Sequence, residues 1–220
     1  MSTHNDSVAA RPGPPAWPPV RLLLASGSPR RRELLTALGA DFTIVPSNID
    51  DGDLTPPPGA TAAAWTIAMA YLKARAAVDA LEPNQNGVVM GADTACELDG
   101  RIIGKPDCQN QARQTLRSMV GQTQRVVTGI ALLDPSRPQT RRLLVADTAL
   151  VTFGAIYEDA IDRYLIADAW RGKAGGYNLT ERLADGWPIT VQGDPDTVVG
   201  LPTGKLGQWL AATGAWSAPA

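Results

Sequence analysis

The fold depends on the stretch Leu22-Leu23-Leu24-Ala25-Ser26-Gly27-Ser28-Pro29-Arg30-Arg31-Arg32-Glu33-Leu34-Leu35. It begins with a short apolar run that is typical of a buried strand, and a turn of small residues follows. Pro29 fits the first position of a helix, with Ser28 as the N-cap, because that position needs no backbone N–H. Gly39 is suited to end this helix. The stretch therefore predicts a strand, a loop and the N-terminus of a helix.

A helix N-terminus that follows a loop of small residues is suited to binding an anion. Free backbone N–H groups and the positive end of the helix dipole face a ligand there. Ser26 and Ser28 add hydroxyl donors, and Arg30, Arg31 and Arg32 add planar cations that match phosphate oxygens. The alternative is an ordinary capped helix with a solvated basic first turn. Three cations at this end oppose the dipole, so a phosphate or carboxylate site is favoured.

Composition excludes several classes of protein. The chain has 220 residues and a net charge of -2, so it can bury a core but lacks the positive charge typical of nucleic-acid binding. No apolar run is long enough to span a membrane, and residues 1–20 lack the apolar segment of a secretory signal. Cys96 and Cys108 form no C-x-x-C pair, which fits a reducing cytoplasm. We therefore expect a cytoplasmic protein without membrane or nucleic-acid partners.

The chain has one histidine, His4, which stands in a polar and Pro-rich stretch. This excludes a Ser–His or Cys–His nucleophile pair and a zinc site built on histidine. Any catalysis would therefore use carboxylates, lysine, arginine or a metal bound by oxygen.

The order of the expected elements predicts an α/β protein, and a chain of 220 residues can form one large domain or two small ones. Residues 1–19 are expected to be a disordered Pro-rich arm, and residues 215–220 a tail. A helix is expected over 60–81, with a core face made of Ala64, Ile67, Ala68, Tyr71, Leu72 and Arg75, and with Lys73 off its centre. The other expected strands are 42–45, 87–95, 124–133, 143–153 and 188–191, and the other helices are 107–120, 157–167 and 203–212.

Three positions carry candidate chemistry. The run Val-Val-Met-Gly-Ala-Asp predicts Asp93 at the carboxyl end of a strand, where open α/β sheets bind ligands, although an Asx turn would explain it too. Gly104 and Pro106 flank Lys105 and restrict its backbone, which favours a positioned lysine. Asp50 and Asp51 follow another strand and are either solvated loop charges or holders of a metal or a base.

With these elements in order, the chain resembles the Maf family of nucleoside-triphosphate pyrophosphatases from about Arg21 to Trp209. The resemblance rests on Leu-Ala-Ser-Gly-Ser-Pro-Arg-Arg-Arg-Glu-Leu-Leu (24–35), Gly-Ala-Asp-Thr (91–94), Gly-Lys-Pro (104–106), Thr-Gly (128–129), Lys-Ala-Gly-Gly-Tyr (173–177) and Val-Val-Gly-Leu-Pro (198–202). It implies a single domain over residues 20–214, with an elongated mixed sheet flanked by helices and two lobes around a central nucleotide cleft. It also implies hydrolysis of a nucleoside triphosphate to the monophosphate and pyrophosphate, with Mg²⁺ or Mn²⁺.

The same resemblance implies a role for each candidate residue. Asp93 is implied as the catalytic proton acceptor and a metal ligand, and Asp51, where the family usually has Glu, as a second metal ligand. The implied substrate-binding residues are Ser26, Arg30, Arg31, Lys73, Thr94, Lys105, Lys173 and Thr180.

The resemblance also bears on the base. Arg31 and Thr94 match positions that mark the branch that cleaves dTTP and UTP, whereas Thr180 stands where that branch has Gln after Tyr-Gly-Ile. We therefore expect dTTP and UTP within a broader set that includes modified nucleotides. The alternatives are an enzyme that prefers 7-methyl-GTP, a non-catalytic nucleotide-binding regulator of cell division, and a nucleic-acid module that uses the arginine cluster. A homodimer is left open.

Overall fold

The computed structural model describes residues 20–49, 54–83 and 85–213. The expected arm, the expected tail, Asp50 and Asp51 therefore lie outside the described residues. The elements are β1 (Leu22–Leu24), α1 (Pro29–Ala37), β2 (Phe42–Ile44), α2 (Ala62–Asp79), β3 (Val88–Leu98), β4 (Arg101–Ile103), α3 (Gln109–Met119), β5 (Thr123–Leu133), β6 (Arg142–Phe153), α4 (Glu158–Ile166), the 3₁₀ turn η1 (Ala174–Gly176), α5 (Leu179–Ala184), β7 (Ile189–Gln192), α6 (Pro195–Val199) and α7 (Thr203–Ala212).

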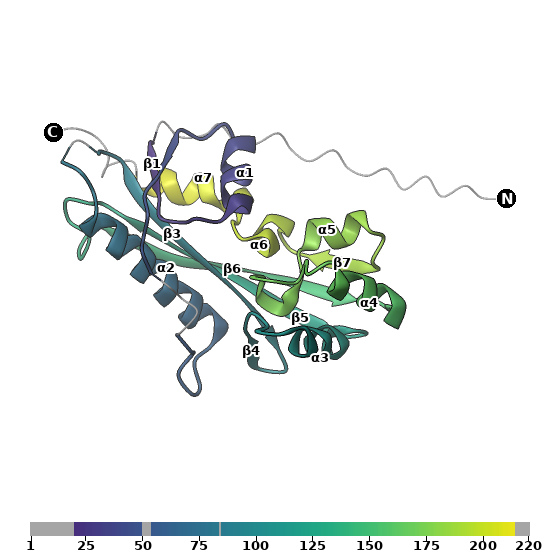
Figure 1. Ribbon diagram of the computed structural model, residues 1–220. Helices are drawn as coiled ribbons and strands as arrows, with labels where there is room; N and C mark the ends of the chain where they lie inside the picture. Colours follow the sequence, from purple (N-terminus) through teal and green to yellow (C-terminus); the bar gives the residue numbers. More distant parts are fainter. Residues whose placement is uncertain (1–19, 50–53, 84, 214–220) are drawn as a thin grey trace.

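The strands form one mixed sheet in the order β2-β1-β3-β5-β6-β7, with β4 paired to β3. Strand β1 runs parallel to β2 and β3, and the remaining pairs are antiparallel. The expected hairpin of β5 and β6 is confirmed, with eleven paired positions. The α/β class and the elongated mixed sheet are thus confirmed, and the long strands β3, β5 and β6 run through the molecule (Figure 1).

A gap in the sheet lies beside the centre of β3. One edge of β3 pairs with β5, so β1 and β4 must share the other edge. Along β3, the pairing with β1 ends at Met90 and the pairing with β4 starts at Cys96, and no described strand pairs with the residues between them on this edge. Asp93 and Thr94 lie in this gap. The prediction that Asp93 ends a strand was wrong, because pairing with β5 extends β3 to Leu98, but Asp93 does lie beyond the carboxyl end of β1.

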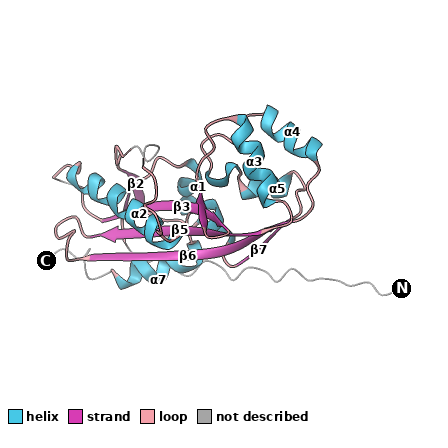
Figure 2. Ribbon diagram, turned by 90° about the horizontal axis from the view of Figure 1, so that it is seen from below, coloured by secondary structure: helices cyan, strands magenta, loops and turns pink. Residues whose placement is uncertain are grey.

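Helices cover the sheet differently at its two ends (Figure 2). At the end that contains β1, α2 packs on one face through Ala70 and Ala74, and α1 and α7 pack on the other through Leu35 and Leu206. We call this the first lobe. At the other end α3, α4 and α5 enclose a separate core with strands β3 to β7, and we call this the second lobe.

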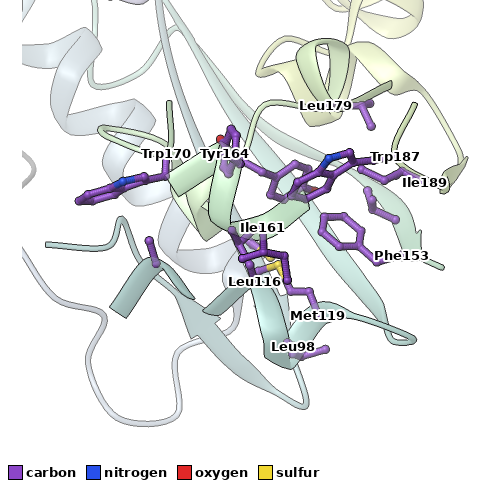
Figure 3. Packing of buried hydrophobic residues seen from close by; sticks show 14 of the residues in the cluster. Leu98, Leu116, Met119, Phe153, Ile161, Tyr164, Trp170, Leu179, Trp187 and Ile189 are labelled. Atoms are coloured by element: carbon purple, nitrogen blue, oxygen red, sulfur yellow. The ribbon is translucent and has the colours of Figure 1, made fainter. Parts of the chain in front are cut away.

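Aromatic side chains fill the core of the second lobe (Figure 3). The Phe153 ring meets the Tyr177 ring edge-on with centroids 5.0 Å apart, and Tyr164 meets Trp187 in the same way at 5.4 Å. Such edge-to-face pairs stabilise a core beyond the area they bury. They also anchor Tyr177, which borders the gap between the lobes.

Helix α2 has the expected bounds, but the prediction of its core face was wrong. The buried residues are Ala62, Thr66, Met69, Ala70, Lys73, Ala74 and Ala77, whereas Leu72 is exposed. Two glycines of the sheet explain this choice of face. A Cβ on Gly91 would lie 2.0 Å from the Ala70 carbonyl oxygen, and one on Gly129 would lie 2.4 Å from the Thr66 carbonyl carbon. The helix therefore packs closely through its small residues, and this turns Lys73 toward the sheet.

Smaller elements also differ from the expectation. The N-cap of α3 is Cys108 and not Asp107, and neither α5 nor α6 was predicted. Both missed helices are short, with six and five residues, so they show almost no helical periodicity. No helix in the described part of the chain is long and apolar enough to cross a membrane.

Candidate active site

A cavity of about 400 Å³ lies at the gap in the sheet, between the two lobes. It is lined by the loop after β1, by α2, by the unpaired part of β3 and by the segment that leads from η1 into α5. Seven of the residues expected in the site line it together: Ser26, Arg30, Arg31, Lys73, Asp93, Thr94 and Lys105. Residues far apart in the sequence therefore converge on one cavity, as predicted.

The loop after β1 and the start of α1 form one part of the lining. Ser28 is the N-cap residue of α1, as predicted, although its side chain makes no capping bond. The Ser26 hydroxyl oxygen accepts a bond from the Ser28 backbone N–H at 3.3 Å. The first turn of α1 thus opens into the cavity together with Arg30, in the arrangement that favours an anion.

Arg31 is buried and ties three segments together. Its Nε donates to the Gly200 carbonyl oxygen at 2.9 Å, its Nη1 to Ser26 Oγ at 3.0 Å and its Nη2 to Thr94 Oγ1 at 3.2 Å. These partners come from the loop after β1, from β3 and from the turn before α7. Hydrogen bonds from three nitrogens of the planar guanidinium therefore fix Arg31 in place, and a lysine could not make this set of bonds.

Thr128 stands behind this arginine on β5, and sequence reasoning did not identify it as functional. Its hydroxyl is fully buried and donates to the Thr197 carbonyl oxygen at 2.7 Å. The Thr94 hydroxyl lies 2.9 Å from the Thr128 hydroxyl. Because Thr128 has already donated its only proton, Thr94 must donate to it, and the Thr94 oxygen then accepts from Arg31. The Thr-Gly motif contained this residue, but nothing in that motif revealed its partners.

The bonds continue from Thr197 to the buried Asp147. The Thr197 hydroxyl donates to Asp147 Oδ2 at 2.6 Å, and Lys205 pairs with the other oxygen. Burial alone would raise the pKa of Asp147, but the bonds from Lys205 and Thr197 lower that pKa below its usual range. Asp147 therefore joins β6, α6 and α7 behind Arg31.

Lys73 and Asp93 form a buried ion pair in the lining. Lys73 Nζ lies 2.7 Å from Asp93 Oδ1, and the two residues are 8% and 9% exposed. The close packing of α2 on Gly91 and Gly129 brings the lysine to this position. Asp93 is the only acidic residue among the described residues that line the cavity.

The described residues contain no group of three or more His, Cys, Asp or Glu that could hold a metal. Asp51 lies outside the described residues, so its expected role stays a prediction. A single carboxylate beside an anion site nevertheless fits Mg²⁺, which typically takes one or two protein carboxylates together with waters and substrate phosphates. The chemistry of the lining is therefore compatible with a metal that arrives with its nucleotide.

On the side of the second lobe, Cys96, Gln124 and Tyr177 form a hydrogen-bonded chain. Cys96 Sγ donates to Gln124 Oε1 at 2.6 Å, and Gln124 Nε2 donates to the Tyr177 hydroxyl oxygen at 3.1 Å. Burial, with a smaller contribution from Glu97, raises the pKa of the Cys96 thiol to about 12. The thiol therefore stays protonated and is unsuited to act as a nucleophile.

Two expected substrate-binding residues do not reach the cavity lining. Lys173 Nζ pairs with Glu181 Oε2 at 2.5 Å, and the Thr180 side chain is exposed on α5. From the same segment, Gly172, Ala174, Tyr177, Asn178 and Leu179 line the cavity instead. The sequence pattern located the correct segment but not the residues in it that face the cavity.

The chain is similar to known proteins in sequence and in structure. The family model described as Maf-like protein matches residues 21–213. The chain is 37% identical over 194 residues to the dTTP/UTP pyrophosphatase of Pelotomaculum thermopropionicum, with 88% of this chain and 96% of the relative covered. It is 39% identical over 199 residues to the dTTP/UTP pyrophosphatase of Moorella thermoacetica, with 88% and 95% covered. A HAM1 protein structure from Coxiella burnetii aligns with a TM-score of 0.47 at 14% identity, over 88% of this chain and 99% of that one.

Proposed function

The chain belongs to the Maf family, and we propose on this premise that it is an enzyme that hydrolyses nucleoside triphosphates to the monophosphate and pyrophosphate. We propose dTTP and UTP as substrates, because relatives that cover nearly the same length carry that name. The observation that carries the proposal is the cavity in which an anion-binding helix end, several cations and one carboxylate meet. The match over residues 21–213 also supports a single domain over residues 20–214.

The cations and the start of α1 would bind the triphosphate. Cleavage at the α-phosphorus places extra negative charge on the pyrophosphate that leaves, and fixed donors that meet this charge lower the barrier. Arg30, Lys105 and the backbone N–H groups at the start of α1 are suited to this role because they line one cavity. Arg31 would add a cation whose orientation does not change during the reaction, since its bonds to Gly200 and Thr94 fix it.

Asp93 would accept the proton of the attacking water. A general base must lie within hydrogen-bonding reach of that proton, and Asp93 is the acidic residue that borders the cavity in the described part of the chain. Lys73 binds one carboxylate oxygen, which orients the group and leaves the second oxygen for water. The same lysine lies close enough to the cavity to serve as a phosphate ligand as well.

We propose Mg²⁺ or Mn²⁺ as the cofactor, held by Asp93 and by Asp51. Asp51 follows Ile49, which lines the cavity, by two positions. A bound divalent ion would neutralise phosphate charge and orient the triphosphate. Lys173 and Thr180 remain proposed substrate ligands only if their side chains move toward the cavity when nucleotide binds.

We propose that the enzyme removes unwanted triphosphates, including modified ones, from the nucleotide pool. Such a pool is cytoplasmic, and both described cysteines are free thiols, as is usual for proteins in a reducing compartment. We therefore propose that the enzyme acts in the cytoplasm.

The decisive experiment incubates the purified full-length chain with dTTP and Mg²⁺ and identifies the products. We expect dTMP and pyrophosphate in equal amounts. Release of dTDP and inorganic phosphate would contradict the proposed site of cleavage. Tight binding of dTTP without hydrolysis would instead support a non-catalytic nucleotide-binding regulator.

A further inference from the structure

The segment from Tyr177 to Leu179 forms the part of the cavity that is best suited to a base. Around it, Val126, Val198 and Val199 supply apolar surface, whereas the cations and the carboxylate lie with the loop after β1, α2 and β3. A flat heterocycle favours such apolar walls, with a small number of polar groups that fix its orientation. A polar side chain in this part of the lining would therefore select the base by a hydrogen bond to its edge.

Most polar groups near this segment are already engaged. The Gln124 amide uses its oxygen for Cys96 and its nitrogen for Tyr177, so both ends are fixed by protein atoms. Thr180, which stands at the position expected to read the base, is exposed and does not line the cavity. The Asn178 side chain, by contrast, is half-buried and lines the cavity directly beside Tyr177 and Leu179.

The orientation of the Asn178 amide is set by its neighbour. Asn178 is the N-cap residue of α5, and its Oδ1 accepts a bond from the Glu181 backbone N–H at 3.2 Å. With the oxygen used in this way, the other half of the amide is the Nδ2 group, which carries two donors. Within the described parts of the chain Nδ2 has no hydrogen-bond partner. The side chain therefore keeps an unused donor group for a ligand in the cavity, while its oxygen is held by the first turn of α5.

We infer that Asn178 selects the base by donating from Nδ2 to a ring carbonyl oxygen, at the position where uracil, thymine and hypoxanthine carry oxygen and cytosine and adenine carry an amino group. This inference rests on the proposed function, since it assigns the base preference of the same cavity. If Nδ2 faced the amino group of cytosine or adenine, neither donor would have an acceptor. Cytosine and adenine are therefore disfavoured. The preference for UTP thus has a physical cause that does not involve Thr180.

The test compares substrates that differ at this group, namely UTP with CTP and ITP with ATP. Asn178→Asp and Asn178→Ser both keep a side-chain oxygen that can cap α5, so the fold is preserved. Both remove the amide donor, and Asp replaces it with an acceptor. Leu183→Ala is the matched control, because it changes an exposed position on the same helix that does not line the cavity. The values of kcat/KM for all four substrates are measured in each protein, and thermal melting verifies folding.

We expect the UTP-to-CTP and ITP-to-ATP ratios of kcat/KM to fall about 10-fold in Asn178→Ser, as for the loss of one hydrogen bond in a buried site. They should fall further in Asn178→Asp, because its carboxylate accepts from an amino group, and they should stay unchanged in Leu183→Ala. Unchanged ratios in folded, active Asn178 variants would overturn the inference and leave the proposed function standing. A wild-type chain that hydrolyses none of the four would overturn the proposed function, and the inference with it.

Discussion

The two sides of the cavity are held in different ways. On the side of the first lobe, which we call the first wall, Arg31, Lys73 and Asp93 are buried, and hydrogen bonds of 2.7 to 3.2 Å fix their charged groups to other protein atoms. On the side of the second lobe, the second wall presents apolar surface and the amide of Asn178. Under the proposed function, the first wall would carry the chemistry common to all triphosphates, and the second wall would choose the base.

The packing behind each wall fits this division. Behind the first wall, a continuous set of hydrogen bonds runs from Arg31 through Thr94 and Thr128 to Thr197 and Asp147. Behind the second wall, Tyr177 is held by aromatic contact with Phe153, while the backbone around it turns at Gly175 and Gly176, which have φ of 68° and 73°. The two walls are therefore supported by different contacts, a set of hydrogen bonds around Arg31 and aromatic packing around Tyr177.

The largest effect is expected from Asp93→Asn in the first wall. Loss of a general base typically lowers the rate by about 10²- to 10⁴-fold, and the amide keeps the shape of the side chain. The measurement is kcat for dTTP, with melting temperature as a check on folding. Asp99→Asn, an exposed position in the turn between β3 and β4, is the matched control and should keep wild-type activity. A kcat near the wild-type value in Asp93→Asn would show that another group acts as the general base.

The next largest effect is expected from Gly129→Ala, which tests how α2 supports the first wall. The new methyl group would meet the Thr66 backbone, so α2 must move and carry Lys73 with it. Overpacking of this kind typically costs about 1–3 kcal/mol of the free energy of unfolding. We expect a lower melting temperature together with a lower kcat. Gly104→Ala is the control for stability, because a Cβ there meets no atom within 4 Å. Equal melting temperatures of the two variants would contradict the close packing.

A smaller effect is expected from Thr128→Val, which removes the hydroxyl behind Arg31 without changing the shape of the side chain. Thr94 then loses the acceptor that sets its orientation, and kcat/KM for dTTP should fall about 10-fold, as for one buried hydrogen bond. Thr128→Ser restores the hydroxyl and should recover most of the activity. If the Ser and Val variants were equally impaired, packing of the methyl group and not the hydrogen bond would be the function of Thr128.

The smallest effect is expected from Asp147, whose contribution to the free energy of unfolding depends on pH. Its pKa is lowered in the folded protein, so its contribution to stability is present above the pKa of the unfolded chain, about 3.9. That contribution is lost as the pH falls through the lower, folded value. Urea unfolding of the wild type and of Asp147→Asn should therefore differ at neutral pH and converge in acid. A difference that stays constant with pH would show that the carboxylate charge is not what stabilises this region.

Sequence reasoning succeeded where local chemistry decides the structure. The strand, loop and helix around Ser26 and Pro29 follow from capping and from the proline position, and the structure confirms them. It failed for α2, because the apolar pattern points to Leu72 and Tyr71, whereas close approach to Gly91 selects the smallest side chains. That choice depends on a contact between distant segments, which no local pattern contains.

The same distinction between local chemistry and contacts between distant segments applies to the candidate site. Arg31, Asp93 and Lys105 stood out by their charge and by the residues around them, and all three line the cavity. Thr128 and Asn178 could not be identified from the sequence, because a hydroxyl or an amide takes its role from the partners that the fold brings to it. The distinction between Asn178 and Thr180 depends on which face of one short helix borders the cavity.

The division between the two walls is tested most directly by the ratio of kcat/KM for UTP to that for CTP in Arg31→Lys and in Asn178→Ser. Lysine cannot make the three hydrogen bonds that the Arg31 guanidinium donates to Ser26, Thr94 and Gly200. We therefore expect kcat/KM for UTP and for CTP to fall by the same factor. The ratio should therefore be unchanged in Arg31→Lys and reduced in Asn178→Ser. A ratio that changes as much in Arg31→Lys as in Asn178→Ser would contradict the account, because the first wall would then choose the base as well.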